Sequence, residues 1–145
     1  MTLHAVATFQ GYLIKKVVLV LFVNKHRILT VTERSGKVGF LSGYVETFDT
    51  KPFKAIKREY KEETGHKLPK LKDIQKFVYR DDTAIYVAST KDYVSTTIIK
   101  RNSEIKAMHL TEVTDIKSAL KGTASFTLRN SAMGSTQLLF KKLNL

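Results

Sequence analysis

The distribution of apolar residues along the chain predicts a series of strands interrupted by one central helix. Residues 17–23 form a continuous, largely β-branched apolar run, which is typical of a strand buried on both faces. After the polar residues 24–26, apolar and polar positions alternate over 28–33, so these two segments predict a hairpin. Further strand candidates lie at 5–9, 38–41, 76–79, 83–88, 94–100 and 105–110.

The spacing of apolar residues changes after residue 51 and becomes helical. The apolar stripe consists of Phe53, Ile56 and Tyr60. Pro52 suits the first turn of a helix, because the amide hydrogen that it lacks has no partner there. Gly65 stands where a helix often ends in a left-handed residue, a conformation that glycine adopts at least cost. The pattern therefore predicts a helix over 52–64.

Two shorter helices are expected near the end of the chain. One leads from Thr111 to about Leu120 and is closed by Gly122, and the other spans Ser135 to Leu143. Strands, a central helix, more strands and late helices predict an α+β fold with a mixed sheet. A length of 145 residues is that of one ordinary domain, so we expect residues 1–145 to form a single domain.

The composition excludes several classes of protein. The chain has no cysteine, which excludes a disulfide scaffold and zinc sites built on thiolates. The longest apolar run, residues 17–23, is far shorter than the roughly 20 residues that span a bilayer. The first residues lack the pattern of a secretory signal. We therefore expect a cytoplasmic protein without a membrane partner.

Charge is distributed unevenly. The chain has 25 Lys and Arg against 13 Asp and Glu, a formal net charge of +12, which favours polyanionic partners or simply solubilises the surface. Several of the scarce acids lie close together in the sequence: Glu46, Asp49, Glu59, Glu62 and Glu63. A basic protein that concentrates its carboxylates in one segment is expected to use them together.

Three of these acids project from neighbouring positions of the predicted helix, since they stand in an i, i+3, i+4 relation. They are Glu59, Glu62 and Glu63. One interpretation is a solvated surface on which nearby Lys and Arg offset the repulsion. The other is a site for Mg²⁺ or Mn²⁺, which are hard cations that prefer carboxylate and carbonyl oxygens.

The surrounding motif favours the second interpretation. Residues 58–65 read R-E-Y-K-E-E-T-G and match the pattern R-E-U-x-E-E-x-G, where U is a bulky apolar or aromatic residue. Residues 43–46, G-Y-V-E, are similar to the loop that precedes it in the same family. The sequence thus resembles a Nudix hydrolase. The resemblance implies a Nudix-type α/β/α sandwich with a mixed sheet and the catalytic helix at about 52–64.

The match departs from the family pattern in the loop before the helix. In the family, five residues separate the glycine from a glutamate, and seven residues separate that glutamate from the arginine. Here either Asp49 replaces that glutamate with one residue inserted, or Thr50 occupies the position. Ser42 and Leu41 replace the usual glycine and proline. These departures concern the loop and leave the three glutamates unchanged.

The resemblance also implies roles for individual residues. The metal ligands would be the carbonyl of Gly43 and three carboxylates, Glu59, Glu62 and Glu63. Arg58 would orient the acidic residues. The general base would be one of the glutamates of the motif, Glu62 or Glu63, or the later Glu104, which precedes the strand at 105–110. Arg34, Glu46 and Tyr79 are candidates for contacts with the substrate, with Tyr79 either stacking on a base or lying in the core.

The implied activity is an Mg²⁺- or Mn²⁺-dependent pyrophosphohydrolase that cleaves a diphosphate linkage in a nucleotide derivative. ADP-ribose, dinucleoside polyphosphates and FAD or NADH form the expected substrate group. One alternative is an RNA 5′-end (cap or triphosphate) pyrophosphohydrolase, which predicts lysines around the acidic helix. Another is a catalytically inactive module that binds nucleotide or RNA. Small phage-encoded members are similar in composition, which would place the protein in the host cytoplasm, and a homodimer could form through 94–100 or 1–15.

Overall fold

We describe the protein from a computed structural model, which describes residues 7–9, 11–99 and 104–145. The strands are β1 (Ala7–Phe9), β2 (Tyr12–Ile14), β3 (Lys16–Asn24), β4 (Arg27–Glu33), β5 (Val38–Gly39), β6 (Leu41–Tyr44), β7 (Lys72–Tyr79), β8 (Thr83–Ser89) and β9 (Ile105–Glu112). The helices are α1 (Pro52–Thr64), α2 (Val113–Leu120) and α3 (Asn130–Lys142). Within the described residues, no helix has the length and apolarity needed to cross a membrane.

Strand β3 lies at the centre of the larger sheet, which has seven strands among the described residues. It runs parallel to β8 over its length, from Lys16 opposite Thr83 to Phe22 opposite Ser89. On its other side it pairs antiparallel with β6 along its first half and with β4 near its end. The predicted hairpin of β3 and β4 is therefore confirmed. Because β3 pairs first with β6 and then with β4, these two strands lie on the same side of β3.

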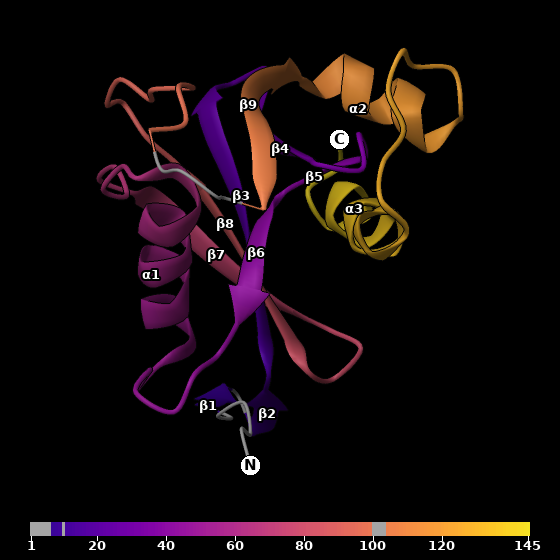
Figure 1. Cartoon of the computed structure of the whole chain (residues 1–145). Helices are drawn as coiled ribbons and strands as arrows, with labels where there is room; N and C mark the ends of the chain where they lie inside the picture. Colours follow the sequence, from indigo (N-terminus) through magenta and orange to yellow (C-terminus); the bar gives the residue numbers. More distant parts are fainter. Residues whose placement is uncertain (1–6, 10, 100–103) are drawn as a thin grey trace.

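The sheet lies between two layers of helices, as Figure 1 shows, with α1 on one side and α2 and α3 on the other. Successive side chains of β3 point to opposite faces of the sheet, as in any pleated strand. Val17, Leu19 and Leu21 belong to the apolar cluster that contains the buried residues of α1. Val18 and Val20 belong to the second cluster, with buried residues of α2 and α3. The mixed sheet and α/β/α layering confirm the expected fold class.

Helix α1 forms at the predicted residues and for the predicted reasons. Pro52 stands in its first turn, and Gly65 follows its end with a positive φ of 83°. The amide of Gly65 donates to the carbonyl of Lys61 at 2.8 Å, which completes the last turn. Ile56 and Tyr60 are buried against the sheet. The opposite side of the helix is left for charged residues.

Three predicted elements need correction. The segment 38–41 is divided at Phe40 into β5, which pairs with β4, and β6, which pairs with β3. The last helix begins at Asn130, earlier than residue 135. Within the predicted strand 5–9 the structure has β1 over Ala7–Phe9, and residues 5–6 lie outside the described part. In the first two cases the type of element was right and its bounds were wrong, whereas in the third the structure confirms a strand over the described residues.

The predicted strand at 94–100 is wrong for its described residues, 94–99, which have no strand geometry. Val94 is buried and Ile98 is partly buried in the cluster under α1, so these β-branched residues pack without joining a sheet. The amide of Ile99 donates to the carbonyl of Thr64 at the end of α1. Strand propensity needs a neighbouring strand edge to be realised, and this segment bonds to a helix end instead. An interface through a strand here is therefore not supported.

Candidate active site

The three glutamates of α1 open onto a cleft of about 690 Å³. Helix α1 packs beside β6, and the cleft runs from the helix across the end of that strand. Its lining includes the acidic residues Glu33, Glu46, Glu59, Glu62, Glu63 and Glu104. It also includes the basic residues Lys16, Arg34 and Arg129. The cleft thus combines carboxylates with cations, an arrangement suited to a ligand that has several phosphates.

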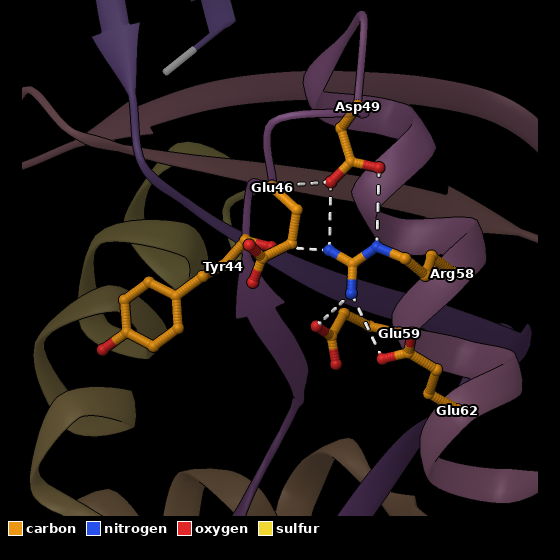
Figure 2. Close-up of polar contacts among 6 residues, drawn as sticks. All are labelled: Tyr44, Glu46, Asp49, Arg58, Glu59 and Glu62. Carbon is orange, nitrogen blue, oxygen red and sulfur yellow. Dashed lines mark hydrogen bonds and ion pairs between the residues drawn. The ribbon is translucent and has the colours of Figure 1, made fainter. Parts of the chain in front are cut away.

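Arg58 holds acidic residues of the cleft together (Figure 2). Its Nη1 donates to Glu59 Oε1 at 2.9 Å and to Glu62 Oε2 at 3.2 Å. Its Nη2 donates to Asp49 Oδ2 at 3.0 Å and to the carbonyl of Tyr44 at 2.8 Å. Burial alone would lower the pKa of Arg58, but the hydrogen bonds to Asp49 and Glu59 raise the pKa above its usual value. The arginine therefore stays charged and links the loop before α1 to the helix.

Asp49 is the acid of the loop that meets Arg58. Its side chain is 4% exposed, and its Oδ2 also accepts the amide hydrogen of Glu46 at 2.8 Å. Thr50 is exposed and makes no such contact within the described part of the chain. Of the two alignments that the sequence left open, the structure favours the one in which Asp49 takes the place of the glutamate and the additional residue follows it.

Glu59 and Gly43 lie in direct contact. A Cβ atom added to Gly43 would lie 2.2 Å from Glu59 Cδ, so only glycine leaves room for this carboxylate beside the backbone of β6. The Glu59 side chain is 13% exposed. Burial raises the pKa of Glu59 above its usual value, and the charges of Glu62 and Glu63 add to this, although Arg58 opposes it. A buried carboxylate whose ionisation is disfavoured is stabilised by a nearby cation.

The other predicted residues divide into two groups. Glu46, Glu104 and Arg34 all line the cleft, so the structure brings them to the glutamates of α1. Tyr79 is not among the residues that line it, which favours the interpretation of Tyr79 as a core residue over that of a stacking residue. Its hydroxyl occupies the space where a Cβ of Gly134 would lie, and its ring packs in the second core cluster. The Tyr79 hydroxyl thus lies against α3, and the ring is partly buried against the core.

Several residues of the cleft were not predicted as functional candidates from the sequence, among them Lys16, Ser42, Tyr44 and Arg129. Arg129 donates to Glu33 Oε1 at 2.7 Å, to the Phe40 carbonyl at 2.6 Å and to Ser42 Oγ at 2.8 Å. Hydrogen bonding to Arg129 holds the pKa of Glu33 below its usual value. No local pattern could reveal this contact, because Arg129 and Glu33 are 96 positions apart in the chain.

The donor set fits a divalent cation in its chemistry. Carboxylate and carbonyl oxygens are the ligands of Mg²⁺ and Mn²⁺, and the close contact of Gly43 with Glu59 brings both kinds together. In the described part of the chain, no three His, Asp or Glu side chains are already gathered around one point that could hold an ion. Glu59 and Glu62 instead contact Arg58, and Glu62, 48% exposed, has room to change rotamer.

Comparison with known proteins agrees with this geometry. The sequence profile of the NUDIX domain matches residues 13–129. The match includes β3, α1, β6 and Arg129, and therefore nearly the whole cleft. No curated protein matches the chain significantly by sequence.

Solved structures share the fold at low identity. The NUDIX domain of Shewanella oneidensis NrtR, complexed with ADP-ribose, has a TM-score of 0.61 and 17% identity, over 93% of this chain and 90% of that one. A NUDIX hydrolase from Nitrosomonas europaea has a TM-score of 0.54 and 17% identity, over 92% and 86%. A bifunctional NMN adenylyltransferase/ADP-ribose pyrophosphatase from Francisella tularensis, complexed with AMP and a Mn ion, has a TM-score of 0.55 and 20% identity, over 97% and 42%.

The profile covers most of the chain, the layers of the fold agree, and the glutamates of the motif line one cleft. The chain belongs to the Nudix family of hydrolases.

Proposed function

We propose that the protein is a divalent-metal-dependent pyrophosphohydrolase that cleaves a diphosphate linkage in a nucleotide derivative. The observation that carries this proposal is the cleft that the glutamates of α1 share with Lys16, Arg34 and Arg129. Carboxylates that bind cations and cations that bind phosphates are both needed to hold a diphosphate. An inactive binding module would not need the three glutamates that this chain retains.

The ligands of Mg²⁺ or Mn²⁺ in this proposal are the carboxylates of Glu59, Glu62 and Glu63 and the carbonyl of Gly43. A bound ion of this kind neutralises phosphate charge and lowers the pKa of a coordinated water. Arg58 keeps Glu59 and Glu62 oriented through its two hydrogen bonds. Glu104, which is exposed at the cleft, is the candidate that accepts a proton from the attacking water. Glu62 and Glu63 remain alternative bases.

Among substrates, we propose ADP-ribose first. Support comes from two of the similar structures, one complexed with ADP-ribose and one of a bifunctional ADP-ribose pyrophosphatase. Because the identities are 17% and 20%, these structures guide the choice of substrates to test. Dinucleoside polyphosphates, FAD and NADH complete the group.

The test is product release from a panel of nucleotides with Mg²⁺ or Mn²⁺, measured beside the variants Glu62→Gln and Glu63→Gln. We expect a nucleoside monophosphate product that requires the metal and falls at least a hundredfold in both variants. Glu112→Gln is the matched control, because Glu112 is exposed on β9, pairs with Arg27 and lies outside the cleft. Unchanged turnover in the two variants, or no turnover of any substrate by folded wild type, would contradict the proposal.

A second candidate, hydrolysis at the 5′ end of RNA, is favoured by a basic groove on the exposed side of α1. The groove measures about 730 Å³ and is lined by Lys54, Lys57, Arg58, Lys61, Glu62 and Gly65. It adjoins the cleft, since Glu62 lines both. Three lysines on one helix side could follow the phosphates of a strand whose 5′ end enters the cleft.

Salt dependence separates the two candidates. Binding of a 5′-triphosphate RNA through the groove should weaken steeply with NaCl, with a log–log slope of about −0.7 per phosphate contact. Changing Lys54, Lys57 and Lys61 together to Gln should make that slope shallower, while turnover of ADP-ribose changes little. A slope that is the same in the triple variant would exclude the groove as an RNA-binding surface.

A further inference from the structure

Two side chains of the cleft come from directly opposed positions of β3 and β6. Lys16 begins β3, Tyr44 ends β6, and the two are partners in the antiparallel register. Partners in such a register project from the same face of the sheet, with Cβ atoms about 5 Å apart. Their neighbours, Val17 and Gly43, project to the face that α1 covers. Lys16 and Tyr44 therefore form a pair on the α3 side of the sheet, and both line the cleft.

The ring of Tyr44 offers an aromatic surface in this position. Its exposure is 50%, which is high for a large apolar side chain at the end of a sheet strand. Tyr79 lies on the same sheet face, two strands from Lys16 and three from Tyr44, since Tyr79 opposes Thr83 and Thr83 opposes Lys16. The Tyr79 hydroxyl lies against α3, whereas Tyr44 lies at the cleft. Figure 2 shows the Tyr44 ring directed away from Arg58, which binds the Tyr44 carbonyl.

The ammonium group of Lys16 offers a positive charge beside that ring. Lys16 is half-buried, and no hydrogen bond or ion pair of its ammonium group occurs within the described part of the chain. Partial burial, together with the nearby Arg129, lowers the pKa of Lys16. A partly desolvated cation without a close partner gains more from an anion than a solvated one does. Asp82 and Glu33 raise the pKa of Lys16 only by electrostatic attraction, without a direct ion pair.

We propose that Lys16 and Tyr44 form the nucleotide-recognition face of the cleft, where Tyr44 stacks on the base and Lys16 pairs with the phosphate of a nucleoside 5′-phosphate. This inference rests on the proposed function and names the residues that bind the nucleotide part of the substrate. Base stacking on an aromatic side chain tolerates every base, so the pair selects nucleotides over other diphosphates. The carbonyl contact with Arg58 ties the position of Tyr44 to the carboxylates of α1.

The experiment measures binding apart from turnover. AMP and ribose 5-phosphate, which lacks the base, are titrated calorimetrically in EDTA into wild type and into Tyr44→Leu, Tyr44→Phe, Lys16→Met and Lys16→Arg. We expect Tyr44→Leu to weaken AMP about tenfold and to leave ribose 5-phosphate unchanged, while Tyr44→Phe retains the affinity. Lys16→Met should weaken both ligands, and Lys16→Arg should retain most of the binding. In turnover, Tyr44→Leu and Lys16→Met should each raise the KM for the nucleotide substrate about tenfold with little change in kcat.

Controls make each outcome decisive. Tyr93→Leu removes an exposed tyrosine outside the cleft and should change neither ligand. If Lys16→Met does not fold, Lys16→Gln replaces it. Any one of three results overturns the inference. Tyr44→Leu weakens AMP and ribose 5-phosphate equally, or Tyr44→Leu and Lys16→Met both leave binding unchanged, or the wild type does not bind AMP. Glu62→Gln should lose turnover and keep AMP binding, so a failure of the hydrolase proposal is seen separately.

Discussion

At the scale of single residues, Arg58 is the residue on which the acidic residues of α1 depend. It meets the buried Asp49, the nearly buried Glu59 and the half-exposed Glu62 with one guanidinium group. A buried charge is tolerated when it is paired and hydrogen-bonded, and each of these carboxylates supplies part of that pairing. The network also explains how the loop accommodates one additional residue. Asp49 still reaches the arginine, so the register of the helix is unaffected.

Gly43 is expected to tolerate no side chain. Gly43→Ala places a methyl group where Glu59 now lies, so either the carboxylate or β6 must move. A displacement of about 1 Å in such a site lowers the rate about a hundredfold, and we expect kcat/KM to fall by that factor in the nucleotide assay. Gly122→Ala is the control for the loss of a glycine alone: nothing lies within 4 Å of its added Cβ, but its φ of 77° strains an alanine, so this variant should lower the Tm and leave kcat/KM unchanged. Full activity of Gly43→Ala would show that this close contact is not needed.

Glu59 is expected to destabilise the protein when no divalent cation is bound. Burial raises the pKa of Glu59 above its unfolded value, so its stabilising contribution is present at low pH and is lost as the pH rises through the folded pKa. In EDTA, Glu59→Gln should therefore have a higher Tm than wild type at neutral pH. The two Tm values should converge below the pKa of an unfolded glutamate. Calorimetry across the acid range tests this, and a lower Tm for Glu59→Gln at pH 7 would contradict it.

At the scale of elements, α3 is attached to the sheet through a residue just before its first turn. Arg129 precedes α3 and bonds to Glu33 of β4, to the Phe40 carbonyl and to Ser42 of β6. Gly39 leaves the space through which the guanidinium passes. One side chain thus joins a helix to both strands that border the cleft. The position of Ser42, next to Gly43, depends on this contact.

Arg129→Gln is expected to lower the free energy of unfolding by about 2 kcal/mol at pH 7, because it removes hydrogen bonds that involve charged groups. The difference should shrink on acidification. Arg129 holds the pKa of Glu33 below its unfolded value, so this stabilisation exists above the unfolded pKa and is lost as the pH falls through the folded one. Urea unfolding at several pH values measures both effects.

The matched control for this experiment is Arg27→Gln. Arg27 pairs with Glu112 at 2.8 Å, but the two side chains are 50% and 42% exposed, so we expect a loss below about 1 kcal/mol. Equal losses for Arg129→Gln and Arg27→Gln would mean that the attachment of α3 does not depend on Arg129.

At the scale of the whole molecule, the cleft combines both faces of one sheet. The glutamates belong to α1 on one face, and Lys16, Ser42 and Arg129 lie toward α3 on the other. A ligand bound between them therefore contacts elements that unfold together. Binding to the folded state alone stabilises the entire fold, by about 2.7 kcal/mol at a hundredfold excess over Kd.

Addition of Mg²⁺ or Mn²⁺ should accordingly raise the Tm of the wild type, and the increase should grow with the logarithm of the ion concentration. Glu62→Gln should reduce the increase, whereas Glu112→Gln should retain it. Thermal unfolding with Ca²⁺-free buffers and defined Mn²⁺ concentrations provides the measurement. An equal increase in all three proteins would place ion binding outside the carboxylates of α1.

The sequence by itself determined the elements whose causes are local. Helical spacing, Pro52 and Gly65 define α1 within a few residues, and the apolar run of β3 and the hairpin to β4 follow from alternation and turn chemistry. The same helical spacing brings Glu59, Glu62 and Glu63 to one side, so the acidic part of the candidate site could be predicted. These features depend on residues at most a few positions apart.

Only the tertiary structure decided the rest, because it depends on pairings between distant parts of the chain. Register places Lys16 beside Tyr44, and α3 lies against the Tyr79 hydroxyl while Tyr44 stays exposed. The β-branched residues 94–99 bond to the end of α1 through Ile99 and Thr64 and have no strand geometry. Whether a side chain is core or cleft is set by what packs over it, and that partner is chosen by the fold as a whole.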